Sequence, residues 1–188
     1  MFINPLTSHT RGFRQKIGDT PSVGQGGGSK EKKMVAAVEK IMDQLGKCPA
    51  GQGGEFRAAE GDLQVRVKMS QADCPAFRLV TLELKSTSGL LSLDPIRVEK
   101  EVNYLAEPLK IVELKKHQGS AILRSFPPRT ENGTVSFFEM VIDRTDGLSL
   151  GRLAYNRNLR TRSQTPALLT RDTLERLLSD LLSLASKK

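Results

Sequence analysis

Hydrophobic residues recur every three or four positions in three segments of the chain, a spacing that places them on one face of an α-helix. The first helix is expected from 34–46, and the glycine at its end is typical of a helix terminus. The second opens with Asp94 as a cap and Pro95 in the first turn, and Pro108 is expected to stop it. The third begins near Thr170. The positions expected to be buried are Val35, Val38, Met42, Leu45, Val98, Val102, Leu105, Leu174, Leu177, Leu178, Leu181 and Ala185.

The intervening chain alternates apolar and polar residues, and this period of two is typical of strands that bury one face. The clearest run is Leu63–Ser70, in which every second residue is apolar. The expected strands are a short one around Phe56, then Leu63–Ser70, Phe77–Lys85, Leu109–Lys115, Ser120–Phe126, Thr134–Ile142 and Leu148–Tyr155. Their connections are short and rich in turn-forming residues, which indicates antiparallel pairing.

The order of helix, three strands, helix, four strands and helix groups the strands in consecutive blocks. This grouping indicates an α+β fold and argues against a Rossmann-like α/β fold. We expect an antiparallel sheet of about seven strands with the helices packed on one face. The domain is predicted to span residues 34–188, preceded by a flexible basic Gly-rich arm at residues 1–33. The order of elements also resembles that of secretion-chaperone-like folds, on topology and without a shared motif.

Charge is distributed unevenly along the chain. The 188 residues include 29 Lys and Arg against 21 Asp and Glu, which gives a net charge of +8. Residues 1–33 and residues 157–188 each carry +4, so residues 34–156 are balanced. A basic excess favours polyanionic or acidic partners. We therefore predict that the two basic ends contact the partner and that the domain between them is a neutral scaffold.

The polar loop expected at Asn156–Pro166 contains three arginines close together. Arginine pairs with phosphate through two parallel hydrogen bonds, and an adjacent tyrosine can stack on a base. The lysines at the end of the arm can neutralise further phosphates. The residues predicted to contact nucleic acid or an acidic partner are Arg157, Arg160, Arg162, Tyr155, Lys30, Lys32 and Lys33.

Simpler interpretations of both basic ends stay open. The loop arginines can form a solvated surface that contacts nothing, because charge runs usually keep a protein soluble. The arm can be a plain disordered tail or an organelle transit peptide, although Pro5, Gly12 and Gly18 oppose the amphipathic helix that transit requires.

The chain lacks local motifs for catalysis, metal binding or phosphate loops. Cys48, Cys74, His9 and His117 share no ligand-like spacing, so no metal or other cofactor is expected. No Gly-x-Ser-x-Gly elbow occurs. No apolar run approaches the roughly 20 residues of a membrane helix, and two cysteines in a chain of this size are expected to be reduced thiols of a cytoplasmic protein.

Two nucleotide-binding motifs do not fit the chain. In the glycine-rich run, Ser29 precedes Lys30 where a phosphate loop has glycine. PilZ domains carry Arg-x-x-x-Arg, whereas Arg124 and Arg129 are separated by four residues. The segment from Asp143 to Gly147 also lacks the serine of the second PilZ motif.

These observations predict a non-enzymatic binding module whose basic ends hold a polyanion, with nucleic acid as the first candidate. The alternative is a protein–protein interaction or chaperone-like adaptor domain that uses an uncovered sheet face or a free edge. An enzyme or small-ligand protein with a dispersed site is a third class, because such sites leave no local motif. The sequence does not indicate an oligomeric state.

Overall fold

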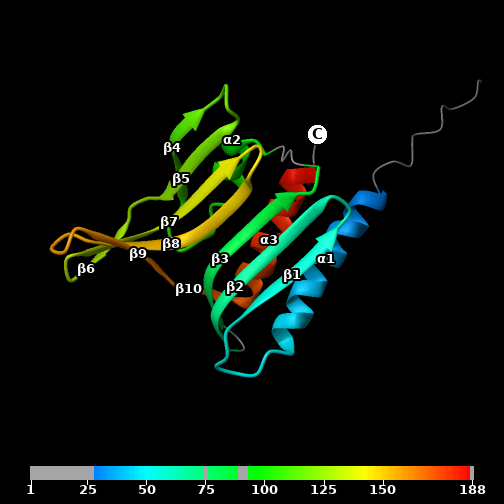
Figure 1. Ribbon diagram of the computed structural model, residues 1–188, viewed down its shortest axis with the longest axis horizontal. Coiled ribbons are helices and arrows are strands. Elements are labelled where there is room, and N and C mark those ends of the chain that lie inside the picture. The colour runs from blue at the N-terminus through cyan, green and yellow to red at the C-terminus, as the bar shows by residue number, and fades with distance from the viewer. Residues whose placement is uncertain (1–27, 74–75, 89–92, 187–188) are drawn as a thin grey trace, which may run out of the picture.

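The computed structural model describes residues 28–73, 76–88 and 93–186, with the side chains described from Ala36 onward except that of Asp73. Within those residues the chain forms an α+β fold with three helices and one antiparallel sheet of ten strands (Figure 1). The elements are α1 (Gly28–Gly46), β1 (Gly54–Glu60), β2 (Leu63–Asp73), β3 (Ala76–Ser86), α2 (Pro95–Glu101), β4 (Leu109–Lys115), β5 (Ser120–Ser125), β6 (Arg129–Glu131), β7 (Thr134–Asp143), β8 (Gly147–Asn156), β9 (Thr161–Thr165), β10 (Ala167–Thr170) and α3 (Arg171–Ser186).

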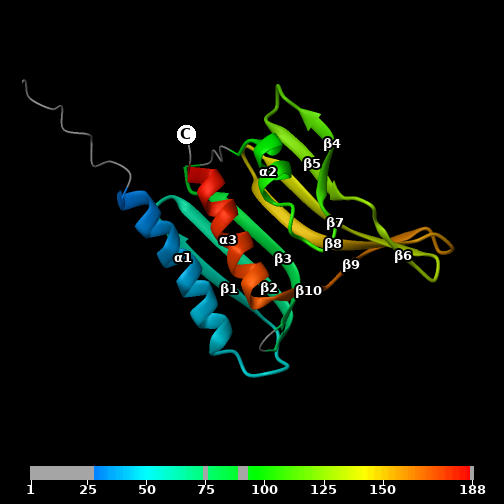
Figure 2. The ribbon, with the colours of Figure 1, turned by 180° about the vertical axis from the view of Figure 1, so that it is seen from behind.

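The main path of the sheet is β1-β2-β3-β8-β7-β5-β4, and β10, β6 and β9 pair with β3, β7 and β8. Figure 2 shows all three helices on the near side of this sheet, with α1 and α3 over β1–β3 and α2 beside β4 and β5. The core lies between the helices and this face. It includes Leu82, Leu150 and Met140 from three neighbouring strands, each at most 1% exposed.

The helix boundaries follow their capping residues only in part. The carboxylate of Asp94 accepts a hydrogen bond from the Ile96 N–H at 3.0 Å, which confirms the expected cap of α2. However, α2 ends at Glu101 and not at Pro108, because the backbone of Val102 (φ −92°, ψ 67°) leaves the helical region. Thr170 accepts a hydrogen bond from the Thr173 N–H at 3.2 Å, as expected for the cap of α3.

The first helix begins at Gly28, ahead of the expected start at Met34. Lys30, Lys32 and Lys33 therefore fall within α1. The rest of the predicted arm, residues 1–27, lies outside the described residues, as do Cys74 and the side chain of Val35.

The expected number of about seven strands was wrong, because the sequence pattern did not predict β6, β9 and β10. The side chains of β6 are all exposed, and those of β9 are exposed except for the half-buried Thr165. Neither strand has an apolar face, so hydrophobic alternation could not reveal it. The predicted loop Asn156–Pro166 is thus the end of β8, a tight turn and β9.

Strands β9 and β10 form a nearly continuous segment that bridges a divergence in the sheet. One part of β8 (148–151) pairs with β3, and the other part (152–156) pairs with β9. At the other end of β3, residues 76–79 pair with β10. The Gln164 side chain of β9 donates a hydrogen bond to the Val80 carbonyl of β3 at 3.0 Å. Val80 lies between the part of β3 that pairs with β10 and the part that pairs with β8.

Candidate binding site on the open sheet face

The face of the sheet away from the helices, here called the open face, is turned toward the viewer in Figure 1. It carries charged residues of the central strands. Strand register aligns Lys68, Thr81, Gly151, Glu139 and Arg124 in one row across five neighbouring strands. Residues that are direct partners across a sheet share a face. The middle of the chain is therefore neutral in total, while its strands present several of their basic side chains to solvent on one side.

Two arginines from distant strands converge on one carboxylate of this face. Arg124 of β5 donates to Glu139 Oε2 at 2.7 Å, and Arg162 of β9 donates to Glu139 Oε1 at 2.6 Å. Both guanidinium groups also lie over the ring of Phe137, at 5.4 and 6.0 Å from its centroid. We call these four residues the arginine cluster. Two cations on one carboxylate leave the cluster with a net positive charge.

Most N–H donors of the two arginines in the cluster are not used by Glu139. A guanidinium has five N–H donors, so one hydrogen bond to Glu139 does not exhaust either arginine. Glu139 is nearly buried, whereas Arg124 and Arg162 remain substantially exposed. The carboxylate and the aromatic ring thus hold the two arginines in fixed positions at the surface, which lowers the entropy cost of binding a phosphate there.

Tyr155 of β8 extends the cluster along the same face. It is the direct cross-strand partner of Arg162 on β9 and of Val135 on β7. Its side chain is exposed, at 38%. A partly exposed aromatic ring beside an arginine is the combination that binds an unstacked base together with its phosphate.

Arg157 and Arg160 lie in the turn between β8 and β9, and both are exposed. The Asn156 side chain organises this turn by accepting hydrogen bonds from the N–H groups of Asn158 and Leu159, each at 3.0 Å. The N–H of Arg157 donates to the Gly133 carbonyl at 3.1 Å, so the turn packs against the β6–β7 hairpin. The turn from which the two arginines extend is therefore held in place by these hydrogen bonds.

The structure brings together some of the residues predicted to bind and separates others. Tyr155 and Arg162 are neighbours, and the two turn arginines lie at the end of the same hairpin. By contrast, the helix that contains Lys30, Lys32 and Lys33 begins at the opposite end of the view in Figure 1. These lysine positions do not adjoin the hairpin.

The sequence analysis missed Arg124, Glu139 and Phe137 as site residues. All three belong to strands that were expected, and they lie on the side of the alternation opposite the core. The missing information was the pairing partner of each strand. Since β9 was not expected, nothing indicated that Arg162 would meet Glu139.

The histidine and cysteine side chains considered as metal ligands do not lie together in the described part of the chain. His117 is exposed in the β4–β5 turn, and Cys48 is half-buried with its thiol 3.7 Å from the Gln52 carbonyl. Among the described residues, no three His, Cys, Asp or Glu side chains gather as metal ligands. In the same part of the chain, no helix combines the length and apolar character needed to cross a membrane.

No family model, curated protein or solved structure matches the chain. Evidence on function comes from the geometry of the open face.

Proposed function

We propose that this protein is a non-enzymatic binding module that holds a nucleic-acid strand on its open face, centred on the arginine cluster and Tyr155. The observation that carries the proposal is the convergence of Arg124 and Arg162 on Glu139 beside an exposed aromatic ring. The turn arginines Arg157 and Arg160 add positive charge at the end of the same hairpin.

The physical basis of binding is phosphate neutralisation with added stacking. Arg124 and Arg162 would pair with phosphate oxygens, and stacking of a base on Tyr155 contributes about 1–3 kcal/mol. Neither contact depends on the identity of the base, so we expect weak sequence preference. We place this activity in the cytoplasm, where Cys48 would stay a reduced thiol.

The proposal is tested by fluorescence anisotropy with a twelve-nucleotide oligo(dT) between about 50 and 200 mM salt. We expect Arg162→Gln to weaken binding by about tenfold, the effect of losing one charge-assisted hydrogen bond. Arg97→Gln is a matched control, because Arg97 lies on α2 with 42% of its side chain exposed, against 45% for Arg162, and also pairs with a glutamate. A flat salt response, or equal loss in the two variants, would refute the proposal.

A protein–protein interaction is the second candidate, and the β4 edge of the sheet favours it. β4 ends the strand order, and its register with β5 slips between Ile111 and Glu113. At this slip Val112 is 56% exposed, and Ile96 of neighbouring α2 is also exposed. An exposed apolar edge can accept a strand or helix of a partner. A protein partner that survives nuclease treatment and is lost in Val112→Lys would favour this function over the first.

A further inference from the structure

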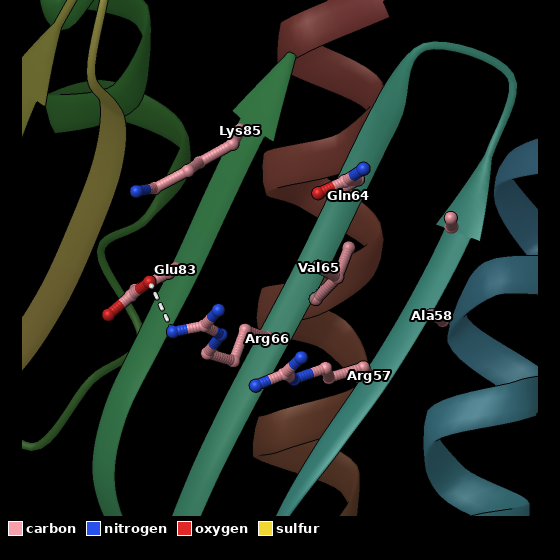
Figure 3. Close-up of a pocket in the computed structure, with 8 residues that line it drawn as sticks. Arg57, Ala58, Gln64, Val65, Arg66, Glu83 and Lys85 are labelled. Atoms are coloured by element: carbon pink, nitrogen blue, oxygen red, sulfur yellow. Dashed lines mark ion pairs between the residues drawn. The ribbon is translucent and has the colours of Figure 1, made fainter. Parts of the chain in front are cut away.

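The open face also contains a depression over β1, β2 and β3, with a volume of about 400 Å³. Ala58 and Val65 line it although their side chains are buried toward the helices, so they contribute backbone to its floor. Ala59 presents only a methyl group and leaves the space open. Arg57 and Arg66 stand side by side in front of the strands (Figure 3).

The cations around this depression outnumber the carboxylates. Arg57 and Arg66 are direct cross-strand partners. Their two guanidinium charges repel each other unless an anion lies between them. Glu55 accepts a hydrogen bond from Arg57 and forms an ion pair with Arg66 at 3.2 Å, and Arg66 also lies 3.7 Å from Glu83. Lys85 lines the same depression and raises its positive charge.

The electrostatics of Glu55 reflect this excess. A hydrogen bond from Arg57, together with the positive charges of Arg57, Arg66 and Lys68, lowers the pKa of the Glu55 carboxyl. Glu55 therefore stays ionised and still does not balance its neighbours, because four cationic side chains surround two carboxylates here. The local excess is positive and exposed to solvent.

We infer that this depression is a second anion subsite, which takes a phosphate group of the same strand that binds the arginine cluster. The inference rests on the proposed function. β2 and β7 are three strand spacings apart, or about 14 Å, and about four stacked nucleotides cover that distance. The open-face positions between them include Thr81 and Ser149, which offer two hydroxyl groups. Glu83 lies on the same face and is paired with Arg66, and the Gln164 side chain lies over Gly151.

The experiment compares two double variants with a control of equal charge. Arg57→Gln/Arg66→Gln removes the depression's arginines, and Arg124→Gln/Arg162→Gln removes those of the cluster. The control variant is Arg97→Gln/Lys100→Gln on α2. The probes are oligo(dT) of twelve nucleotides and inorganic pyrophosphate, the second of which is too short to span both places.

We expect the depression variant to bind the twelve-nucleotide probe about tenfold more weakly than the control, with a salt slope smaller by about 0.7, the value for one lost phosphate contact on a single strand. Pyrophosphate should bind each double variant through the arginines that remain, and the variant that lacks all four arginines should fail to bind it. Lys85→Gln, expected to weaken binding about threefold, provides the same test if the double variant is unstable.

The outcomes separate the two proposals. If the depression variant binds like the control while the cluster variant loses binding, the subsite is overturned and the proposed function stands. If only the depression variant loses binding, the subsite stands and the cluster is not the centre of the site. If the cluster variant still binds pyrophosphate but the depression variant keeps the control's affinity and salt slope for oligo(dT), the strand-spanning role is overturned. Binding by both variants at the level of the control overturns both proposals.

Discussion

Arg152 and Glu107 form a nearly buried ion pair that links β8 to the segment before β4. Two guanidinium nitrogens donate to the carboxylate at 3.3 and 3.1 Å, and the two side chains are 13% and 14% exposed. Ser125 also donates to Glu107, at 3.2 Å, and accepts the Phe138 N–H at 2.9 Å. This network lies on the helix side of the sheet. It fixes the part of β8 that carries Tyr155 on the other face.

Breaking this pair is expected to destabilise the fold. Glu107→Gln leaves the Arg152 charge without its counter-ion in a nearly buried site, and we expect the free energy of unfolding to fall by about 3 kcal/mol. Urea denaturation measures the change. Glu101→Gln, which removes the exposed partner of Arg97, should cost less than about 0.5 kcal/mol. Similar losses in the two variants would contradict the structural role of the buried pair.

Tyr104 is expected to make stability fall at alkaline pH. Its hydroxyl is buried without a hydrogen-bond partner, and Arg176 stacks 4.0 Å above its ring. Burial, and then the nearby Asp180 carboxylate, raise the pKa of the phenol above its ordinary value of 10. Above about pH 10 the unfolded chain therefore releases this proton while the folded chain retains it, so folding loses stability as the pH rises.

The measurement compares urea denaturation of the wild type and Tyr104→Phe from pH 8 to pH 11. We expect the wild type to lose more free energy of unfolding across this interval than the phenylalanine variant, which has no proton to release. At pH 8 the variant should be at least as stable, because it removes a buried hydroxyl that lacks a partner. Parallel losses in the two proteins would show that Tyr104 does not contribute.

The cap of α2 should have a measurable effect on stability. Asp94→Ala removes the acceptor of the Ile96 N–H and is expected to cost about 1 kcal/mol. Asp94→Asn keeps an oxygen in the same place and should cost much less. Thermal unfolding of both variants gives the comparison, and equal destabilisation would argue against the capping bond.

Gly147 is expected to tolerate no side chain. Its φ of +96° is a conformation that other residues rarely adopt, and an added Cβ would lie 2.3 Å from the Leu84 carbonyl oxygen. Gly147→Ala should lower the free energy of unfolding by about 2–3 kcal/mol through strain where β8 meets β3. Gly46→Ala is the control, since nothing lies within 4 Å of its added Cβ. Chemical denaturation should therefore show a lower free energy of unfolding for Gly147→Ala and a higher one for Gly46→Ala.

Local features were readable from the sequence because their causes lie within a few residues. The alternation in Leu63–Ser70 predicts a strand with one buried face, and Val65 and Val67 are buried as expected. Asp94 and Pro95 predict the start of α2 for the same reason, since a cap needs only its own first turn. The end of α2 was missed because the backbone of Val102 leaves the helix before the proline is reached.

The candidate site depended on strand pairing, which the alternation of residues does not encode. The alternation in β5 and β7 places Arg124 and Glu139 on the side opposite the core whatever their neighbours are, and it does not reveal the strand of Arg162. Only the order β5-β7-β8-β9 brings these side chains together, across 15 and 23 residues of chain. The sequence by itself thus determined which residues are buried and where most elements lie, because periodicity and capping are local. The tertiary structure alone decided which charges became neighbours, because register is set by packing between distant strands.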